Sequence, residues 1–387
     1  MTKATRTTTV LAGFAAAMLA AATGGAAWAQ SKEPLKLGLV LSLSGPTSVY
    51  GIPERDAILT ALEDINANGG AGGRKVEFVL FDDKSNPTEA TRGVNQLISN
   101  DKVDAIIGPS SGSSILAAAP IAQRLQVPLL APAGTIAITD KKNAFFPWVF
   151  RLAINDMTGI KMILSTAAKS GAKRIAVFYQ EDAYGKTGVD FANQLSKELG
   201  YEVVETVSAP YNATDLTAQA TKLRNAQPDT VFMQVSVSSL GAAYMKASRQ
   251  VGLEVPTYVN SGLALKSFVD AIGPVGNGLR VLSIGNLPYE PSPGEAKLAA
   301  LLQKAGKEPQ GWAELIGTNG LIAAVDAAKT IEGKIDGAKM RDALEKLCGI
   351  EAYVRGKGCF SSDNHDGWGD GSLVITEVSD GKLRTRQ

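Results

Sequence analysis

Residues 103–139 contain two consecutive strand–loop–helix units, and this stretch constrains the fold more than any other part of the chain. In the first unit, the apolar run 105–107 ends at a Gly-Pro pair, and a serine-rich turn leads into an alanine-rich helix. In the second unit, residues 127–130 form a short apolar strand, and residues 131–135 form an exposed turn after it. Short buried strands that alternate with helices predict a parallel sheet with helices on both faces.

The turns of these two units predict a site for a small anionic ligand. In an open parallel sheet, ligands bind beyond the carboxyl ends of the strands. Helix N-termini at that edge offer unpaired N–H groups and the positive end of the helix dipole. The turns at 110–114 and 131–135 would both lie there, so a small molecule that carries a carboxylate is the expected ligand.

The same alternation extends over most of the chain. Apolar strand patterns at 35–41 and 76–81 precede the central units, and helical patterns follow each of them. A second series of strands and helices begins near residue 155, with strands predicted at 175–179 and 230–234. Two similar series in one chain predict two similar doubly wound α/β lobes with parallel sheets.

The length of the chain also favours two domains, because 387 residues exceed what a single core usually contains. We expect residues 30–154 and 285–371 to form an N-terminal lobe. Residues 155–284 and 372–387 would form a C-terminal lobe, with a closing strand at 371–378.

The overall charge disfavours nucleic acid as a partner. The formal net charge is +1, and charged residues make up 20% of the chain against 45% hydrophobic residues. Such a balance indicates neither a disordered chain nor a surface that binds polyanions.

The first 29 residues have the features of a secretory signal peptide. Lys3 and Arg6 precede an uncharged stretch at 7–22, and residues 27–29 form an A-x-A cleavage site before Gln30. The alternative is a membrane anchor, but the apolar run is shorter than the roughly 20 residues that a span needs. We therefore expect a mature protein that is free in an exported compartment.

The two cysteines, Cys348 and Cys359, predict one disulfide in such an oxidising compartment. Closing so short a loop stabilises a fold by about 3 kcal/mol on the chain-entropy model. A metal site is the alternative, although two cysteines and the single His365 supply too few ligands unless carboxylates join them. We expect no metal and no cofactor.

A series of short motifs carries a resemblance to a known family. The motifs occur in this order: residues 41–46 with 50–51, 65–70, 82–83 with Pro87, 107–109 with Ser111 and Ser113, 131–135, and 184–185. This order is similar to that of periplasmic solute-binding proteins of the leucine/isoleucine/valine type, the receptors of ABC importers. The resemblance covers essentially the whole mature chain. It implies a non-enzymatic protein of the type I periplasmic binding fold, which we expect to be a monomer.

In that family, two lobes joined by three crossovers close by hinge motion on a small carboxylate ligand and deliver it to an inner-membrane ABC permease. The resemblance implies that ligand-binding residues of the first lobe are Ser111 or Ser113, the backbone of Ala133, Thr135 and Tyr50. The opposite lobe would contribute Tyr184, with Ser236 and Ser261 as further candidates. A ligand-sensing receptor of the same fold is the alternative function, and the sequence does not separate the two.

Ser261 marks a departure from the family pattern, because amino-acid binders of this type place an acidic residue at the aligned position. An ammonium group in a closed cleft needs a counter-charge or several good acceptors. Two ligand classes therefore stay open: branched-chain amino acids, and aliphatic or aromatic carboxylates without an amine. The segment 360–367 resembles one found in some aromatic-acid receptors of the family, which is a weak indication of the second class.

A serine hydrolase is a remote alternative. Residues 108–112 match G-x-S-x-G between a predicted strand and a predicted helix, with Ser110 as the nucleophile and His365 as the base. However, fewer strands precede the motif than in such hydrolases, and no HGG-like oxyanion loop is present. We also expect His365 to lie in a surface segment rich in glycine and aspartate, so we predict no enzymatic activity.

Overall fold

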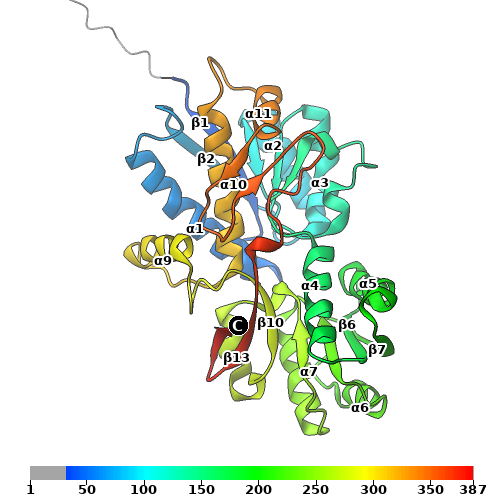
Figure 1. Ribbon diagram of the computed structural model, residues 1–387. Helices are drawn as coiled ribbons and strands as arrows, with labels where there is room; N and C mark the ends of the chain where they lie inside the picture. Colours follow the sequence, from blue (N-terminus) through cyan, green and yellow to red (C-terminus); the bar gives the residue numbers. More distant parts are fainter. Residues whose placement is uncertain (1–31, 387) are drawn as a thin grey trace, which may run out of the picture. The chain divides into compact units, whose positions relative to one another are not determined.

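The computed structural model describes residues 32–386 (Figure 1). The predicted signal peptide and its cleavage site lie outside the described residues.

The first sheet contains five strands in the order β2-β1-β3-β4-β5, and every neighbouring pair is parallel. Its strands are β1 (Leu35–Leu41), β2 (Val76–Asp82), β3 (Ala105–Ile107), β4 (Leu129–Ala131) and β5 (Val149–Arg151). The intervening helices are α1 (Ser48–Ala67), α2 (Pro87–Ser99) and α3 (Gly112–Leu125). All residues of β3, β4 and β5 are buried, as expected for a parallel sheet whose two faces are both covered.

The second sheet contains seven strands in the order β14-β13-β10-β9-β8-β6-β7. Its strands are β6 (Arg174–Gln180), β7 (Glu202–Ala209), β8 (Thr230–Gln234), β9 (Thr257–Val259), β10 (Arg280–Ile284), β13 (Leu373–Ser379) and β14 (Lys382–Thr385). The helices of this half are α4 (Asp156–Lys169), α5 (Ala183–Leu199), α6 (Thr217–Asn225), α7 (Ser238–Gln250) and α8 (Lys266–Ile272). Strands β6 to β10 are parallel and repeat the order of the first sheet.

One edge of the second sheet is antiparallel, a feature that the sequence analysis did not predict. Strand β13 pairs antiparallel with both β10 and β14. A two-residue turn, Asp380 and Gly381, joins β13 to β14, and both residues have positive φ angles of 49° and 69°. An Asp-Gly pair is a common hairpin turn because Gly and Asp tolerate this backbone conformation.

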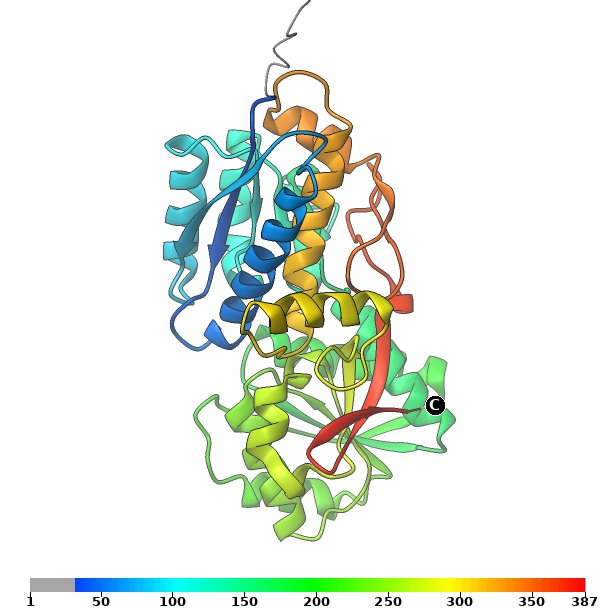
Figure 2. The same cartoon turned by 90° about the vertical axis from the view of Figure 1, so that its left-hand side faces the viewer.

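The chain passes between the two sheets three times: after β5, after β10 and before β13. Between the second and third passages it forms α9 (Pro293–Lys304), α10 (Trp312–Lys329) and α11 (Gly337–Leu344). Helix α10 lies beside α1 of the first half, as Figures 1 and 2 both show. Gly317 permits this approach, since a Cβ built there would lie 3.2 Å from Cα of Glu54. The predicted α/β class with two parallel-dominated sheets is therefore confirmed.

Helix α1 begins earlier than the sequence predicts. Proline is frequent at the first position of a helix, so the sequence predicts that Pro53 opens the helix and that Tyr50 and Gly51 belong to the preceding loop. In the structure the helix starts at Ser48 and contains Pro53. A proline inside a helix removes one backbone hydrogen bond. Packing of the 20-residue helix against α10 outweighs that loss. As a result, Tyr50 lies on a helix rather than on a loop.

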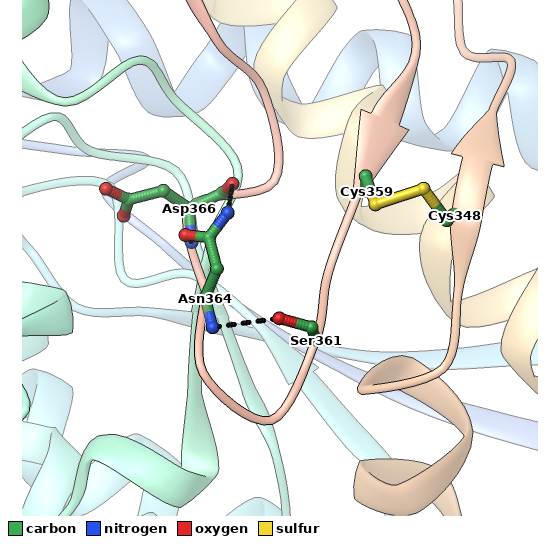
Figure 3. The surroundings of a disulfide bond; sticks show 5 residues. All are labelled: Cys348, Cys359, Ser361, Asn364 and Asp366. Carbon is green, nitrogen blue, oxygen red and sulfur yellow. Dashed lines mark hydrogen bonds between the residues drawn. A yellow bond between two sulfur atoms is a disulfide. The ribbon is translucent and has the colours of Figure 1, made fainter.

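The disulfide between Cys348 and Cys359 is present, as predicted. It joins two short antiparallel strands, β11 (Cys348–Ile350) and β12 (Gly358–Cys359), as Figure 3 shows. In the turn that follows β12, the Asn364 backbone N–H donates to the Ser361 hydroxyl over 3.1 Å, and the Asn364 side chain donates to the Asp366 carbonyl over 3.3 Å.

Replacing both cysteines with serine is expected to lower the free energy of unfolding by about 3 kcal/mol, because the unfolded chain regains the entropy of an 11-residue separation. Urea unfolding of both proteins, with and without a reductant, measures this change. The reductant should destabilise the wild type and leave the double variant unaffected. A double variant as stable as the oxidised wild type would contradict the prediction.

Candidate functional site

Several of the predicted ligand-binding residues follow the strands at which the order of each sheet reverses. This reversal occurs between β1 and β3 in the first sheet and between β6 and β8 in the second. Tyr50 follows β1 and Ser111 follows β3, while Tyr184 follows β6 and Ser236 follows β8. Such switch points are where open α/β sheets bind ligands.

The serine-rich turn after β3 forms the N-terminus of α3. Ser111 is the N-cap, and its hydroxyl accepts a hydrogen bond from the Ser114 backbone N–H. Ser113 is exposed, and its hydroxyl lies 3.3 Å from that of Ser111. A Cβ built on Gly112 would lie 2.0 Å from Oγ1 of Thr135, so Thr135 packs directly against the first turn of α3. The structure therefore brings Ser111, Ser113 and Thr135 together.

Arg151 supports the turn that contains Ala133 and Thr135 through hydrogen bonds to its backbone. Arg151 was not among the residues predicted from the sequence. Arg151 is fully buried and donates to the backbone oxygens of Gly134, Thr135 (2.7 Å) and Ile136 (3.0 Å). It also forms an ion pair of 2.7 Å with Asp366. An arginine at the end of an otherwise apolar strand was the signal in the sequence, because a buried arginine requires partners.

Tyr50 connects the two halves of the site. Its buried hydroxyl donates to the backbone oxygens of Ser236, at 2.7 Å, and Gly262, at 3.3 Å. Its ring lies 5.1 Å from that of Trp312 at the start of α10. Burial raises the pKa of Tyr50, so the phenol stays protonated and remains a donor at neutral pH. The backbone oxygen of Ser236, rather than its side chain, is therefore the group that contacts Tyr50.

The side chain of Ser236 is occupied within its own half. Its hydroxyl and backbone N–H both contact Oε1 of the buried Gln180, at 3.2 and 2.9 Å. Nε2 of Gln180 in turn donates to Asp182, the N-cap of α5. Tyr184 lies in the first turn of that helix, where burial and the negative charge of Asp156 raise its pKa.

Ser261 lies beside the site, but its neighbour Asn260 is the more deeply placed residue. Ser261 is partly exposed and its backbone N–H donates to the Asn260 side chain over 2.8 Å. Asn260 is buried, and its Nδ2 donates to Gln234 over 3.3 Å. The sequence analysis missed Asn260 and Gln234, since a single polar residue after an apolar strand does not reveal its burial.

The hydrolase hypothesis is wrong, because Ser110 and His365 have other partners. The Ser110 hydroxyl donates to the buried carboxyl of Glu54 over 2.6 Å. The His365 ring stacks between Phe146 and Phe150, with ring centroids 4.3 and 4.0 Å away. His365 is only 1% exposed, so its predicted place at the surface is also wrong. Stacking between these two aromatic rings accounts for the burial of His365.

Two cavities, of about 360 and 180 Å³, lie at the opposite end of the second sheet, where β8, β9 and β10 begin. Arg280 lines both and pairs with Glu377, which also pairs with Arg386. Charges of both signs therefore line these cavities. Among residues 32–386, no group of three or more His, Cys, Asp or Glu side chains is arranged to hold a metal ion.

A family model described as "Periplasmic binding protein" matches residues 34–382. The chain belongs to the periplasmic binding protein family. It is 27% identical over 372 residues to the Leu/Ile/Val-binding protein homolog 7 of Brucella abortus, covering 92% of each chain.

Solved structures share the fold of this chain. An extracellular ligand-binding receptor from Rhodopseudomonas palustris is 25% identical, with a TM-score of 0.79 over 91% of this chain and 99% of that one. A solute-binding protein of an ABC transporter from R. palustris, solved with 4-hydroxybenzoate, is 23% identical with a TM-score of 0.80. That alignment covers 92% of this chain and 96% of the R. palustris protein.

Membership of the periplasmic binding protein family decides several points about function. The protein binds a small solute and is not an enzyme. The family implies a periplasmic or extracellular location. No helix within residues 32–386 has the length and apolar character of a membrane span.

Proposed function

We propose that this protein captures a small carboxylate ligand in the periplasm and delivers it to an inner-membrane ABC permease. The observation that carries the proposal is the contact of Tyr50 with the backbone of Ser236 and Gly262. Tyr50 follows β1 at the switch point of the first sheet, and Ser236 follows β8 at the switch point of the second, so this contact joins the two switch points. In the proposal, the ligand lies between a lobe of residues 30–154 with 285–371 and a lobe of residues 155–284 with 372–387.

The N-terminus of α3 would hold the ligand's carboxylate. Ser111, Ser113 and Thr135 lie together there, and the Ala133 backbone belongs to the same turn. Unpaired N–H groups and the helix dipole favour negative charge at this position. From the other side, the ligand would meet Tyr184, Ser236 and Ser261. Contacts to both lobes give the ligand a higher affinity for the closed form, which the permease would recognise.

The names of related proteins support two classes of ligand. The Brucella relative is named for leucine, isoleucine and valine, whereas a fold neighbour from R. palustris was solved with 4-hydroxybenzoate. Both classes share a carboxylate and an apolar body. The N-terminus of α3 would bind the carboxylate that both ligand classes share. The rest of the pocket would distinguish ligands by their apolar part. We expect the protein to act as a monomer with no cofactor.

Changing Ser113 or Thr135 to alanine is expected to weaken ligand binding by roughly 1.5 to 3 kcal/mol each, the range for a hydrogen bond to a charged group. A thermal-shift screen of refolded protein from Gln30 onward first identifies the ligand among amino acids and amine-free carboxylates. Calorimetry on each variant then measures affinity. Unchanged affinity in both variants would rule out the proposed carboxylate site.

Transport is tested separately from binding. Uptake of the labelled ligand should fall in a strain that lacks the protein and return when the gene is restored. Normal uptake combined with tight binding would favour a ligand-sensing receptor over a transport component.

A further inference from the structure

A short connection between α9 and α10 contacts the second half of the chain, outside the predicted ligand-binding residues. The Lys266 backbone N–H donates to the Gln310 carbonyl over 2.7 Å. Leu265 and Gly311 form an antiparallel bridge beside this hydrogen bond. Gln310 and Gly311 immediately precede α10. Leu265 and Lys266 lie at the start of α8, after β9 of the second sheet. Two segments that are distant in the sequence therefore pair through their backbones.

The connection approaches the second half very closely at Gly311. A Cβ built on Gly311 would lie 2.5 Å from the Ala264 carbonyl oxygen, which is closer than a Cβ atom can pack. Gly311 also has a φ angle of 152°, a backbone conformation that favours glycine. The absence of a side chain at this position therefore permits the backbone pairing between the two segments.

The connection is itself fixed to the first half. The carboxylate of the buried Glu314, in the first turn of α10, accepts the backbone N–H groups of Gln310, at 2.9 Å, and Gly311, at 2.6 Å. Lys307 forms an ion pair of 3.2 Å with Asp56 of α1. Both α9 and α10 pack against α1. The connection is thus anchored in the first half and reaches the second half through Gln310 and Gly311.

The paired segments lie apart from the three passages of the chain between the sheets. Those passages follow β5 and β10 and precede β13, whereas the contact between Lys266 and Gln310 joins the start of α8 to the start of α10. The two segments can therefore separate when the lobes open and pair again when they close. In the structure this contact is formed together with the contact of Tyr50 with Ser236, which also joins the two halves.

We propose that the backbone contact between Lys266 and Gln310 stabilises the closed form of the protein and thereby raises its affinity for the solute, without touching the solute. The inference rests on the proposed function, in which the ligand lies between two lobes that close. The apparent affinity of a ligand depends on the population of the form that binds it best, so a contact made only in the closed form adds to affinity. Lys266 and Gln310 are positioning residues for closure.

Lys266→Pro tests the contact, because proline lacks the N–H that donates to Gln310. Lys266 is the first residue of α8, a position where proline is well tolerated in a helix. The preceding Leu265 has an extended backbone, with φ −121° and ψ 140°, which suits a residue before proline. Lys266→Ala is the matched control, since it also removes the ion pairs with Asp270 and Glu308 but keeps the N–H. The difference between the two variants therefore isolates the backbone hydrogen bond.

Two measurements on refolded protein from Gln30 onward detect the change: calorimetry with L-leucine and with 4-hydroxybenzoate as probes, and small-angle X-ray scattering without ligand. If the ligand-free protein is mainly open, Lys266→Pro should bind the probe about three- to tenfold more weakly than Lys266→Ala, which corresponds to one net backbone hydrogen bond. If the ligand-free protein is mainly closed, the affinity changes less, and the radius of gyration of Lys266→Pro should exceed that of Lys266→Ala.

The outcomes separate this inference from the proposed function. Equal affinities together with equal radii of gyration in the two variants would overturn the inference and leave the proposed function intact. If neither probe binds to the wild type, that result counts against the proposed function, and equal radii of the ligand-free variants overturn the inference as well.

Hydrogen exchange of the wild type decides the inference if Lys266→Pro does not fold. With a saturating probe bound, the Lys266 amide should exchange slowly, because its N–H donates to the Gln310 carbonyl in the closed form. Rapid exchange of this amide in the bound protein would overturn the inference.

Discussion

Replacing Arg151 with methionine is expected to lower the free energy of unfolding by about 3 to 5 kcal/mol, the range for breaking a buried ion pair. Arg151 is fully buried, whereas its partner Asp366 is 30% exposed. Burial alone would raise the pKa of Asp366, but Arg151 and a hydrogen bond from Thr139 hold that pKa below its usual value. Methionine preserves much of the volume but leaves Asp366 without its cation.

The same substitution should also impair ligand binding. The backbone oxygens of Gly134, Thr135 and Ile136 all lose a donor in Arg151→Met, so the turn that carries Thr135 loses its support. We therefore expect a lower affinity for the ligand even at temperatures where the variant is folded. Urea unfolding followed by circular dichroism measures stability, and calorimetry measures affinity.

A matched control is Arg92→Met, which breaks the exposed ion pair between Arg92 and Glu89 on α2. Exposed pairs contribute little to stability, so this variant should unfold close to the wild-type midpoint. If Arg151→Met is as stable as Arg92→Met, the structural role assigned to Arg151 is wrong.

Replacing Glu54 with glutamine is expected to stabilise the protein at alkaline pH, by an amount on the order of 4 kcal/mol at pH 8 and above. Glu54 is fully buried on α1, and burial raises its pKa from 4.5 to about 8, despite the hydrogen bond from Ser110. The neighbouring Asp83 raises it further. Glutamine resembles the protonated acid and can still accept the Ser110 hydroxyl.

The sign of the effect follows from proton linkage. Below pH 4.5, Glu54 carries its proton in both the folded and the unfolded state, so it causes no loss of stability. Between about pH 4.5 and 8 the unfolded chain releases the proton while the folded protein retains it, so stability falls as pH rises. The wild type and Glu54→Gln should therefore have similar stability near pH 4.5 and diverge up to about pH 8.

Thermal unfolding from pH 4.5 to 9 checks this prediction. Glu63→Gln serves as the control, because Glu63 is exposed on the same helix and should give a curve parallel to that of the wild type. A constant difference between Glu54→Gln and the wild type over the whole range would show that Glu54 does not titrate as described.

Much of the fold could be predicted because the signals are local. The alternating apolar strands and amphipathic helices gave the two α/β halves, and Ser111 was recognised in the turn that caps α3. The disulfide followed from two nearby cysteines in a chain with export features. The antiparallel hairpin was missed although its Asp380–Gly381 turn was present in the sequence.

The sequence by itself determined the order of strands and helices, the serine- and threonine-rich turns at the ends of strands, and the family. Only the tertiary structure decided which polar residues meet inside the protein. Tyr50 and Ser236 are 186 residues apart, and Arg151 and Asp366 are 215 residues apart. Periodicity and capping depend on neighbours within a few residues, whereas the burial and pairing of a charge depend on where distant segments return.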